Sequence, residues 1–123
     1  MLKSLLVAMS LICFTTLAAA QQVAPVVVLV KVFPAVGRED ELQTLYLKRL
    51  EFLRKAEPDA TFRLHRSVKE PKTFLWYEVY PSQTAYDNHL KVVMVNFRKE
   101  SGPTPDGIIA NPSESETFSE LGR

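Results

Sequence analysis

The sequence has little cysteine, and its only one, Cys13, lies within the first 20 of the 123 residues. That stretch has a basic start at Lys3, an almost uncharged apolar run over residues 5–17, and three alanines over residues 18–20. This order is typical of a secretory signal peptide and predicts cleavage after Ala20. We therefore expect a secreted or periplasmic protein. Its mature chain would have no disulfide and no thiol nucleophile, although export permits disulfides.

The apolar run is too short to favour a membrane-spanning helix, and an uncleaved N-terminal anchor is the alternative.

The chain also lacks an excess of charge of either sign. The 15 basic side chains include Lys3, so the mature chain would carry 14 basic and 14 acidic side chains. This balance does not suggest a strongly charged partner, so we expect no binding to nucleic acid and no stable membrane anchoring after cleavage.

Glycine and histidine are also scarce. The four glycines stand apart, so the chain has neither a glycine-rich phosphate loop nor a dinucleotide-binding fingerprint. It lacks the G-x-S-x-G motif of nucleophilic serines. The two histidines, His65 and His89, are 24 residues apart and do not have the spacing of metal ligands. We therefore expect no metal and no cofactor.

What remains is a chain of strands and amphipathic helices. Residues 26–33 form a continuous β-branched run between prolines, which predicts a strand buried on both faces. Residues 37–55 begin with acids and end with bases around apolar residues at helical spacing, which predicts a helix. Residues 61–68 and 74–80 predict two further strands. Ser82 is a good N-cap for a second helix that ends near Gly102.

The last part of the chain is less regular. Residues 101–112 are rich in proline and glycine and predict a loop, either a lid or a poorly ordered arm, and residues 114–121 could form a last strand. We divide the chain into a signal peptide (1–20), a core (21–100) and this loop with its short strand (101–123). The order β-α-β-β-α-β predicts an α+β, ferredoxin-like fold, with a four-stranded antiparallel sheet and two helices on one face. Because the central strands are apolar on both faces, we expect a homodimer packed sheet to sheet around a cavity.

Three segments resemble the antibiotic-biosynthesis-monooxygenase (ABM) family, and the similarity extends over about residues 26–100. They are residues 57–62 (EPDATF), 74–80 (FLWYEVY) and 83–90 (QTAYDNHL). The resemblance implies a dimeric α/β barrel. Its members include cofactor-free oxygenases of quinols and polyketide aromatics, isomerases of small dicarbonyl compounds, haem-degrading enzymes and proteins without known activity. Asp59 stands where the family usually has glycine, a second family histidine is absent, and the first strand lacks the asparagine of the haem degraders.

The strand at residues 74–80 supplies candidate site residues. Alternation separates two sets of side chains along it. We expect the set Phe74, Trp76, Glu78 and Tyr80 to face the cavity between the two sheets, and the set Leu75, Tyr77 and Val79 to pack against the helices. Trp76 and Tyr80 would then bind a flat aromatic substrate. The alternative is a filled dimer interface in which Glu78 pairs with Arg63.

His89 follows Tyr86 by three residues and shares its helix face. Imidazole exchanges protons near neutral pH, so His89, assisted by Glu78 or Tyr86, is the candidate catalytic base. A purely structural histidine is the alternative. Arg63 and His65 share a strand face; facing inward they would bind substrate, with His65 as an alternative base, and facing outward they would be solvated.

These observations lead to three functional hypotheses. The first is a cofactor-independent monooxygenase acting on a quinol, phenolic or polyketide-type molecule. The second is an isomerase or cyclase of small carbonyl compounds that uses the same base without oxygen. The third is a dimeric ligand-binding protein without catalysis.

Overall fold

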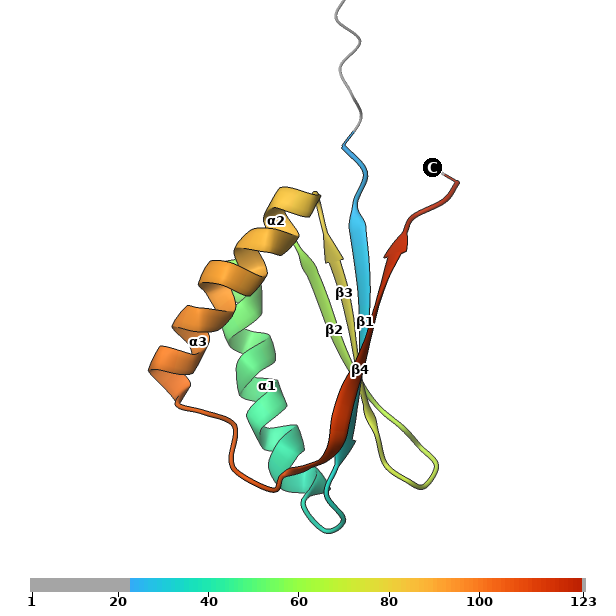
Figure 1. Ribbon diagram of the computed structural model, residues 1–123, viewed down its shortest axis with the longest axis vertical. Coiled ribbons are helices and arrows are strands. Elements are labelled where there is room, and N and C mark those ends of the chain that lie inside the picture. The colour runs from blue at the N-terminus through green and yellow to red at the C-terminus, as the bar shows by residue number, and fades with distance from the viewer. Residues whose placement is uncertain (1–22, 123) are drawn as a thin grey trace, which may run out of the picture.

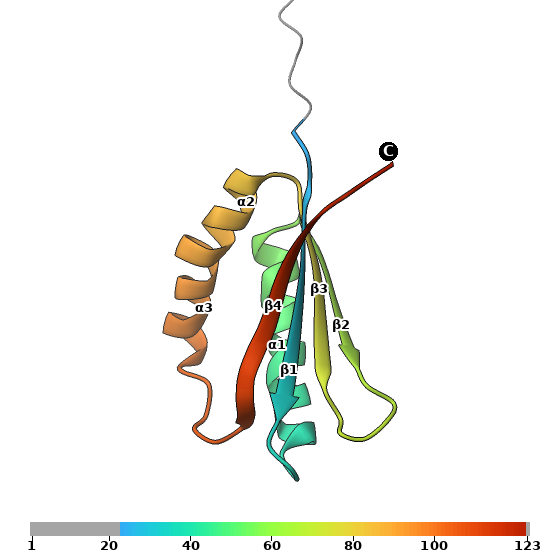
Figure 2. The ribbon, with the colours of Figure 1, turned by 45° about the vertical axis from the view of Figure 1, so that its right-hand side comes forward.

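The computed structural model describes residues 23–122, so the predicted signal peptide and its cleavage site lie outside the described residues. The elements, in chain order, are β1 (Val26–Pro34), α1 (Glu39–Ala56), β2 (Thr61–Arg66), β3 (Phe74–Tyr80), α2 (Gln83–Asn88), the π-helical turn η1 (His89–Val93), α3 (Met94–Ser101) and β4 (Ile109–Ser119). The strands pair antiparallel in the order β2-β3-β1-β4. Figures 1 and 2 show the helices on one side of this sheet, with the other side open. The predicted α+β, ferredoxin-like fold is confirmed.

Helix α1 forms for the reasons that its sequence indicates. Three acids occupy its first turn and Arg54 and Lys55 its last, which complements the helix dipole. Its buried side chains recur at spacings of four, four and three residues and form one stripe against the sheet: Leu42, Tyr46, Leu50 and Leu53.

The second helical segment is continuous over α2, η1 and α3. Ser82 is its N-cap, as predicted, and its Oγ accepts a hydrogen bond from the Ala85 N–H at 3.0 Å. The helix widens into a π-helical turn at His89, and such turns often occur at functional sites. The turn buries His89 and Val93 against the sheet. Gly102, with φ of +77°, ends the segment. None of the helices in the described part of the chain is long and apolar enough to cross a membrane.

The predicted faces of β3 are wrong. Phe74, Trp76, Glu78 and Tyr80 are buried against the helices, and Leu75, Tyr77 and Val79 are half-buried on the open face. Tyr46 of α1 contacts the rings of both Phe74 and Trp76 edge-on, at centroid distances of 5.6 and 5.3 Å. The candidate site therefore lies inside one copy of the chain, between sheet and helices, and not between two sheets.

The predicted loop at residues 101–112 is too long, because β4 begins at Ile109. Ile108 is completely buried in the core, and its carbonyl oxygen accepts a hydrogen bond from the Ala35 N–H at 2.8 Å. This anchoring excludes a poorly ordered arm at that point. β4 is an edge strand along β1, and almost all of its side chains are exposed.

Candidate functional site

A small cavity between the sheet and the helices brings the candidate polar side chains together. We call it the inner cavity; its volume is about 150 Å³, and its polar lining includes Arg49, Trp76, Glu78 and His89. Valines of β1 and Leu53 of α1 complete its apolar walls. A second hollow of about 240 Å³, the outer pocket, lies between α1 and residues 101–105 and shares Tyr46 and Arg49 with the inner cavity.

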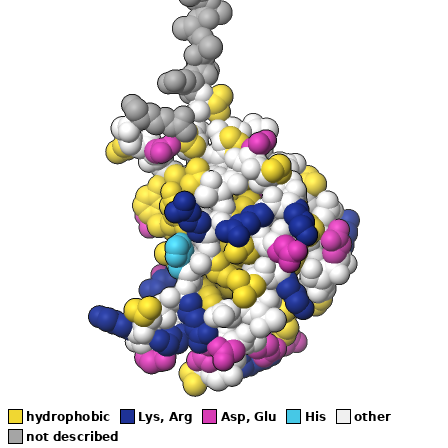
Figure 3. All heavy atoms as spheres, turned by 180° about the vertical axis from the view of Figure 1, so that it is seen from behind, with side chains coloured by type: hydrophobic (Ala, Val, Ile, Leu, Met, Phe, Trp, Pro, Cys, Tyr) yellow, Lys and Arg dark blue, Asp and Glu magenta, His cyan; other side chains and the backbone are white. Residues whose placement is uncertain are grey.

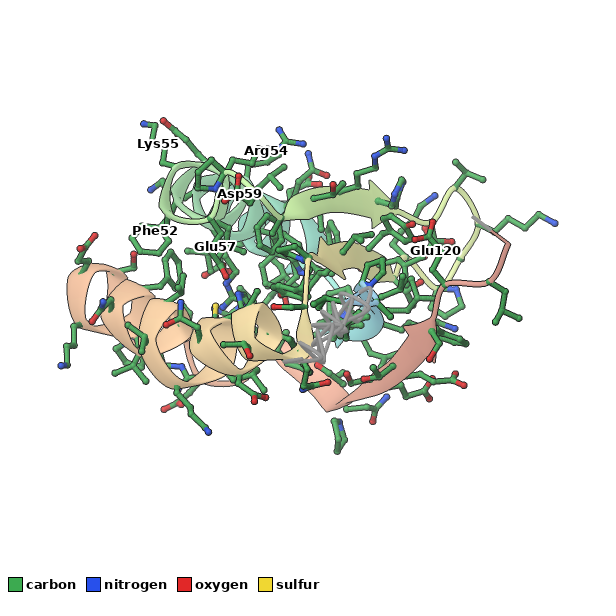
Figure 4. All side chains as sticks on the ribbon, turned by 90° about the horizontal axis from the view of Figure 1, so that it is seen from above. Phe52, Arg54, Lys55, Glu57, Asp59 and Glu120 are labelled. Carbon is green, nitrogen blue, oxygen red and sulfur yellow. The ribbon has the colours of Figure 1, made fainter. Side chains whose placement is uncertain are left out.

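His89 is held by a carboxylate that the sequence did not single out. Its Nδ1 lies 2.7 Å from Oε2 of Glu57, and the two side chains are only 6% and 9% exposed. Glu57 caps the C-terminus of α1, where its N–H donates to the Leu53 carbonyl. Figure 4 shows its side chain directed into the space between α1 and α2, whereas Lys55 points outward. When Nδ1–H donates to Glu57, the lone pair of Nε2 is left available for a substrate proton.

Aromatic rings fix the orientation of this imidazole. Tyr86 stacks on it with an interplanar angle of 17° at 6.5 Å, and the rings of Tyr80 and Phe62 lie 5.0 and 5.8 Å away. The imidazole therefore has one polar contact and an apolar surround, which favours a single ring position.

Glu78 and Tyr80 form a second buried polar pair. The Tyr80 hydroxyl donates to Glu78 Oε2 at 2.6 Å. Burial raises the pKa of Glu78 above its ordinary value, although the Tyr80 hydrogen bond and the nearby His89 oppose the rise. Burial and the adjacent Glu78 also raise the pKa of Tyr80. Burial therefore disfavours the charged forms of both side chains.

Arg49 and Trp76 carry buried donors without an acceptor. Arg49 Nε and Trp76 Nε1 are both inaccessible to solvent and have no partner in good hydrogen-bond geometry among the described residues, although the Tyr46 hydroxyl lies near enough to Trp76 to interact with it. The Arg49 guanidinium lies between two rings, 5.0 Å from the centre of Tyr46 and 5.2 Å from that of Phe97. Burial lowers the pKa of Arg49, and the fields of Tyr46 and Glu78 work in the opposite direction.

The structure brings together five of the predicted site residues: Trp76, Glu78, Tyr80, Tyr86 and His89. Arg63 and His65 lie elsewhere. Their register partners are Tyr77 and Leu75, so both are exposed on the open face of the sheet, and neither can reach the inner cavity of its own chain.

Sequence reasoning missed Glu57 and Arg49. Arg49 had a detectable signature, because it falls on the buried stripe of α1, three residues after Tyr46 and four before Leu53. A base at that position is unexpected for a face that packs on a sheet. Glu57 begins the segment 57–62 that resembles the family, but its contact with His89 spans 32 residues and could not be read from that segment. In the described residues, no three His, Cys, Asp or Glu side chains converge as a metal site.

A single antiparallel sheet with helices on one face and a polar cavity between them defines the α+β, ferredoxin-like class. Within that class, residues 25–93 match the model of the antibiotic biosynthesis monooxygenase family, and this is more than half of the chain. The chain therefore belongs to the antibiotic biosynthesis monooxygenase family. No curated protein matches it in sequence.

Solved structures share the fold at low sequence identity. Rv0793 from Mycobacterium tuberculosis is 20% identical with a TM-score of 0.63, over 81% of this chain and 98% of that one. PA3566 from Pseudomonas aeruginosa is 16% identical with a TM-score of 0.63, over 82% and 98%. The heme degrader MhuD from Mycobacterium tuberculosis, solved with two hemes in its active site, is 16% identical with a TM-score of 0.62, over 80% and 97%. These similarities establish the fold alone.

Proposed function

We propose that the protein is a cofactor-independent monooxygenase acting on a quinol, phenolic or polyketide-type small molecule. The observation that carries this proposal is the buried Glu57–His89 pair, whose imidazole borders the inner cavity beside Trp76. A cavity of about 150 Å³ can hold a single aromatic ring, since one of that size binds benzene in another protein. Membership of the family supports an oxygenase.

The proposed reaction begins with proton transfer. His89 Nε2 removes the proton from a substrate hydroxyl, and Glu57 stabilises the imidazolium that forms. The resulting anion is rich in electrons and adds dioxygen at a ring carbon that bears hydrogen. The peroxide anion then takes the proton back from the His89 imidazolium and becomes a hydroperoxide. Loss of water from this hydroperoxide leaves a carbonyl, so one oxygen atom enters the product and the other becomes water. The substrate supplies all the electrons, and no other reductant is needed.

Glu78, when protonated, would have a supporting role in this reaction. A neutral carboxyl can donate a hydrogen bond to a developing oxyanion, whereas a carboxylate would repel it. The raised pKa of Glu78 supports such a donor. We expect Trp76 to contact the substrate ring. Tyr80 is completely buried and does not line the inner cavity, so it would act through its hydrogen bond to Glu78.

Similarity to a heme degrader raises haem as a possible ligand, but the residues do not fit it. His89 Nδ1 is bonded to Glu57, and the imidazole is almost fully buried among aromatic rings. The inner cavity is also far smaller than a tetrapyrrole macrocycle requires. No step of the proposed reaction involves haem.

Oxygen uptake tests the proposal. Purified protein is mixed with a panel of hydroquinones and anthrones, and oxygen consumption is followed with an electrode. We expect stoichiometric uptake, with one atom of ¹⁸O₂ in the product. Product that forms equally fast under argon would contradict the proposal and favour an isomerase or cyclase. No turnover of any panel member would favour a non-catalytic ligand-binding protein.

We propose further that the open face of the sheet is a homodimer interface. Its centre is apolar, with Val27 and Leu29 of β1 beside Val79 and Tyr77 of β3. Figure 3, the view from behind, shows hydrophobic side chains reaching the surface between charges of both signs. An apolar sheet face of this kind is normally covered by a second layer.

The charges at the two edges support one arrangement of the dimer. Arg63, Tyr77, Leu29 and Glu116 form one row across the sheet, with the base on edge strand β2 and the acid on edge strand β4. A two-fold axis parallel to the strands places β2 of each copy over β4 of the other. Each Arg63 then faces Glu116 of the second copy. An axis in the plane of the sheet and perpendicular to the strands would instead place the Arg63 side chains of the two copies opposite each other.

We propose lastly that the protein is exported and cleaved after Ala20, on the evidence of its signal-peptide pattern. The mass of the protein recovered from a secreting host tests this. A mature chain that begins at Gln21 is expected, and recovery of the uncleaved chain would favour the N-terminal anchor.

A further inference from the structure

The unsatisfied donors in the inner cavity have a feature in common. Trp76 Nε1 sits in a side chain that is 3% exposed, and Arg49 Nε is equally closed to solvent. Both residues line the same cavity. Buried polar groups are nearly always hydrogen-bonded, because an unmet donor costs free energy. Arg49 Nε has no acceptor and Trp76 Nε1 has only the poorly aligned Tyr46 hydroxyl, so an acceptor belongs in this cavity.

The charge of Arg49 makes the same point independently. It forms no salt bridge with any described residue, and its close contacts are the rings of Tyr46 and Phe97. Glu78 is near enough to influence Arg49, but it makes no salt bridge with it, and its Oε2 accepts the hydrogen bond from the Tyr80 hydroxyl. Glu57 pairs with His89. Arg49 is half-buried, and its Nε is closed to solvent. A partly desolvated guanidinium without a carboxylate is an unfavourable arrangement that an anionic ligand would relieve.

We propose that Arg49 and Trp76 form a subsite for an anionic oxygen, so that the preferred ligand is an aromatic ring bearing both a hydroxyl and a carboxylate. The hydroxyl would lie against His89, and this part of the proposal rests on the proposed function. The carboxylate would accept from the guanidinium and from the indole N–H, and this part stands without any turnover. Arg suits the role because its donors are fixed in a plane that matches a carboxylate.

The outer pocket provides the route by which a ligand would reach the inner cavity. It shares Tyr46 and Arg49 with the inner cavity, so the two spaces adjoin at these side chains. Lys48 also lines it, and Arg98 is close enough to act on Arg49 electrostatically. Two bases lining the pocket, with Arg98 nearby, give a positive potential that attracts an anion. The inner cavity alone is smaller than a typical small-molecule site of about 300–1,000 Å³, and the outer pocket supplies the missing room.

Binding under argon tests the subsite without turnover. The probes are 4-hydroxybenzoate and its neutral amide, 4-hydroxybenzamide. Trp76 is the only tryptophan, so its fluorescence reports on this cavity alone, and calorimetry gives the dissociation constant. We expect the acid to quench Trp76 and to bind more tightly than the amide.

Three variants test whether Arg49 and Trp76 are responsible for the tighter binding of the acid. Arg49→Met should weaken binding of the acid by about 10- to 100-fold, which is the loss expected for charged hydrogen bonds. It should leave amide binding nearly unchanged. Trp76→Phe, measured by calorimetry, keeps a ring and should weaken acid binding by a smaller factor. The control is Lys55→Met, which removes one charge from an exposed position of the same helix and should change nothing.

Circular dichroism and thermal unfolding establish that each variant is folded. A folded Arg49→Met variant that binds the acid as tightly as the parent would overturn the subsite. So would a parent protein that binds neither probe at millimolar concentration. Loss of oxygen uptake is irrelevant here. Acid binding that depends on Arg49 in a protein without oxygenase activity would support the subsite and reject the proposed function.

Discussion

The buried pair of Glu57 and His89 can be tested through its contribution to folding. Glu57→Met and His89→Phe remove the hydrogen bond while approximately keeping side-chain size. His89→Phe leaves the Glu57 carboxylate without its partner, and breaking a buried pair in this way costs about 3–5 kcal/mol. Because Glu57 also lines a surface pocket, water can partly replace the imidazole, and we use the lower end, about 3 kcal/mol.

Glu57→Met should cost less, because it leaves a histidine that can remain neutral. The loss is then one hydrogen bond, about 1 kcal/mol. The double variant leaves no unpaired charge, so we expect about 2 kcal/mol instead of the sum of about 4, which is a coupling energy of about 2 kcal/mol. Urea unfolding of the four proteins, followed by circular dichroism, measures this cycle.

The same helix provides a matched control. Lys55 Nζ lies 2.9 Å from Glu51 Oε1, close to the distance in the buried pair, but these side chains are 76% and 69% exposed. Solvent screens such a pair, so its coupling should be near the limit of detection. Additive single variants at Glu57 and His89, with a coupling no larger than that of Glu51 and Lys55, would refute the buried charge-assisted contact.

Three further predictions concern other parts of the fold. Because burial raises the pKa of Glu78 above 4.5, the native state binds a proton that the unfolded chain releases; stability is full below about pH 4.5 and declines as the pH rises through the higher native pKa. Glu78→Gln should flatten that decline in urea midpoints, and an unchanged decline would assign it to other groups. Arg63→Glu should shift the protein to monomer in light scattering, and adding Glu116→Arg should restore the dimer; a double variant that stays monomeric would contradict the strand-parallel axis. Ser82→Ala should cost about 1 kcal/mol of unfolding free energy by removing the N-cap hydrogen bond, and no change in urea midpoint would argue against that cap.

The element order was predictable because each element carries its own local evidence. The acids and bases at the ends of α1, the Ser82 cap and the β-branched run of β1 are short-range features that the fold keeps. β4 was not predictable in the same way. Its polar side chains have no strand pattern, and its position is fixed by pairing with β1. Pro112 is tolerated there because the strand is an edge and its register shifts nearby.

The faces of β3 show where pattern reasoning fails. Alternation separates the two sets of side chains but does not say which set faces the helices. The set with Glu78 and Tyr80 looked more polar, yet it is the buried one, because those two side chains satisfy each other at 2.6 Å. The set with Leu75 and Tyr77 looked like core, and it forms the open face. Pairing between side chains, which single-residue hydropathy omits, decides the outcome.

His89 was found from its motif, but its partner was not. Local spacing along the chain predicts neighbours within a helix, such as Tyr86, and cannot predict a contact between the end of α1 and the start of η1. The contacts that surround His89 could therefore be identified only from the structure.

The central claim is that His89 acts as the base in the inner cavity, and its most direct test is turnover of the two single-histidine variants. His89→Gln and His65→Gln each remove one of the two histidines, one bordering the cavity and the other exposed on the open face. With the best hydroquinone or anthrone from the panel, we expect His89→Gln to lose about 100- to 10,000-fold in kcat, the usual contribution of a general base, and His65→Gln to match the parent. Equal kcat in His89→Gln and the parent protein would contradict the account.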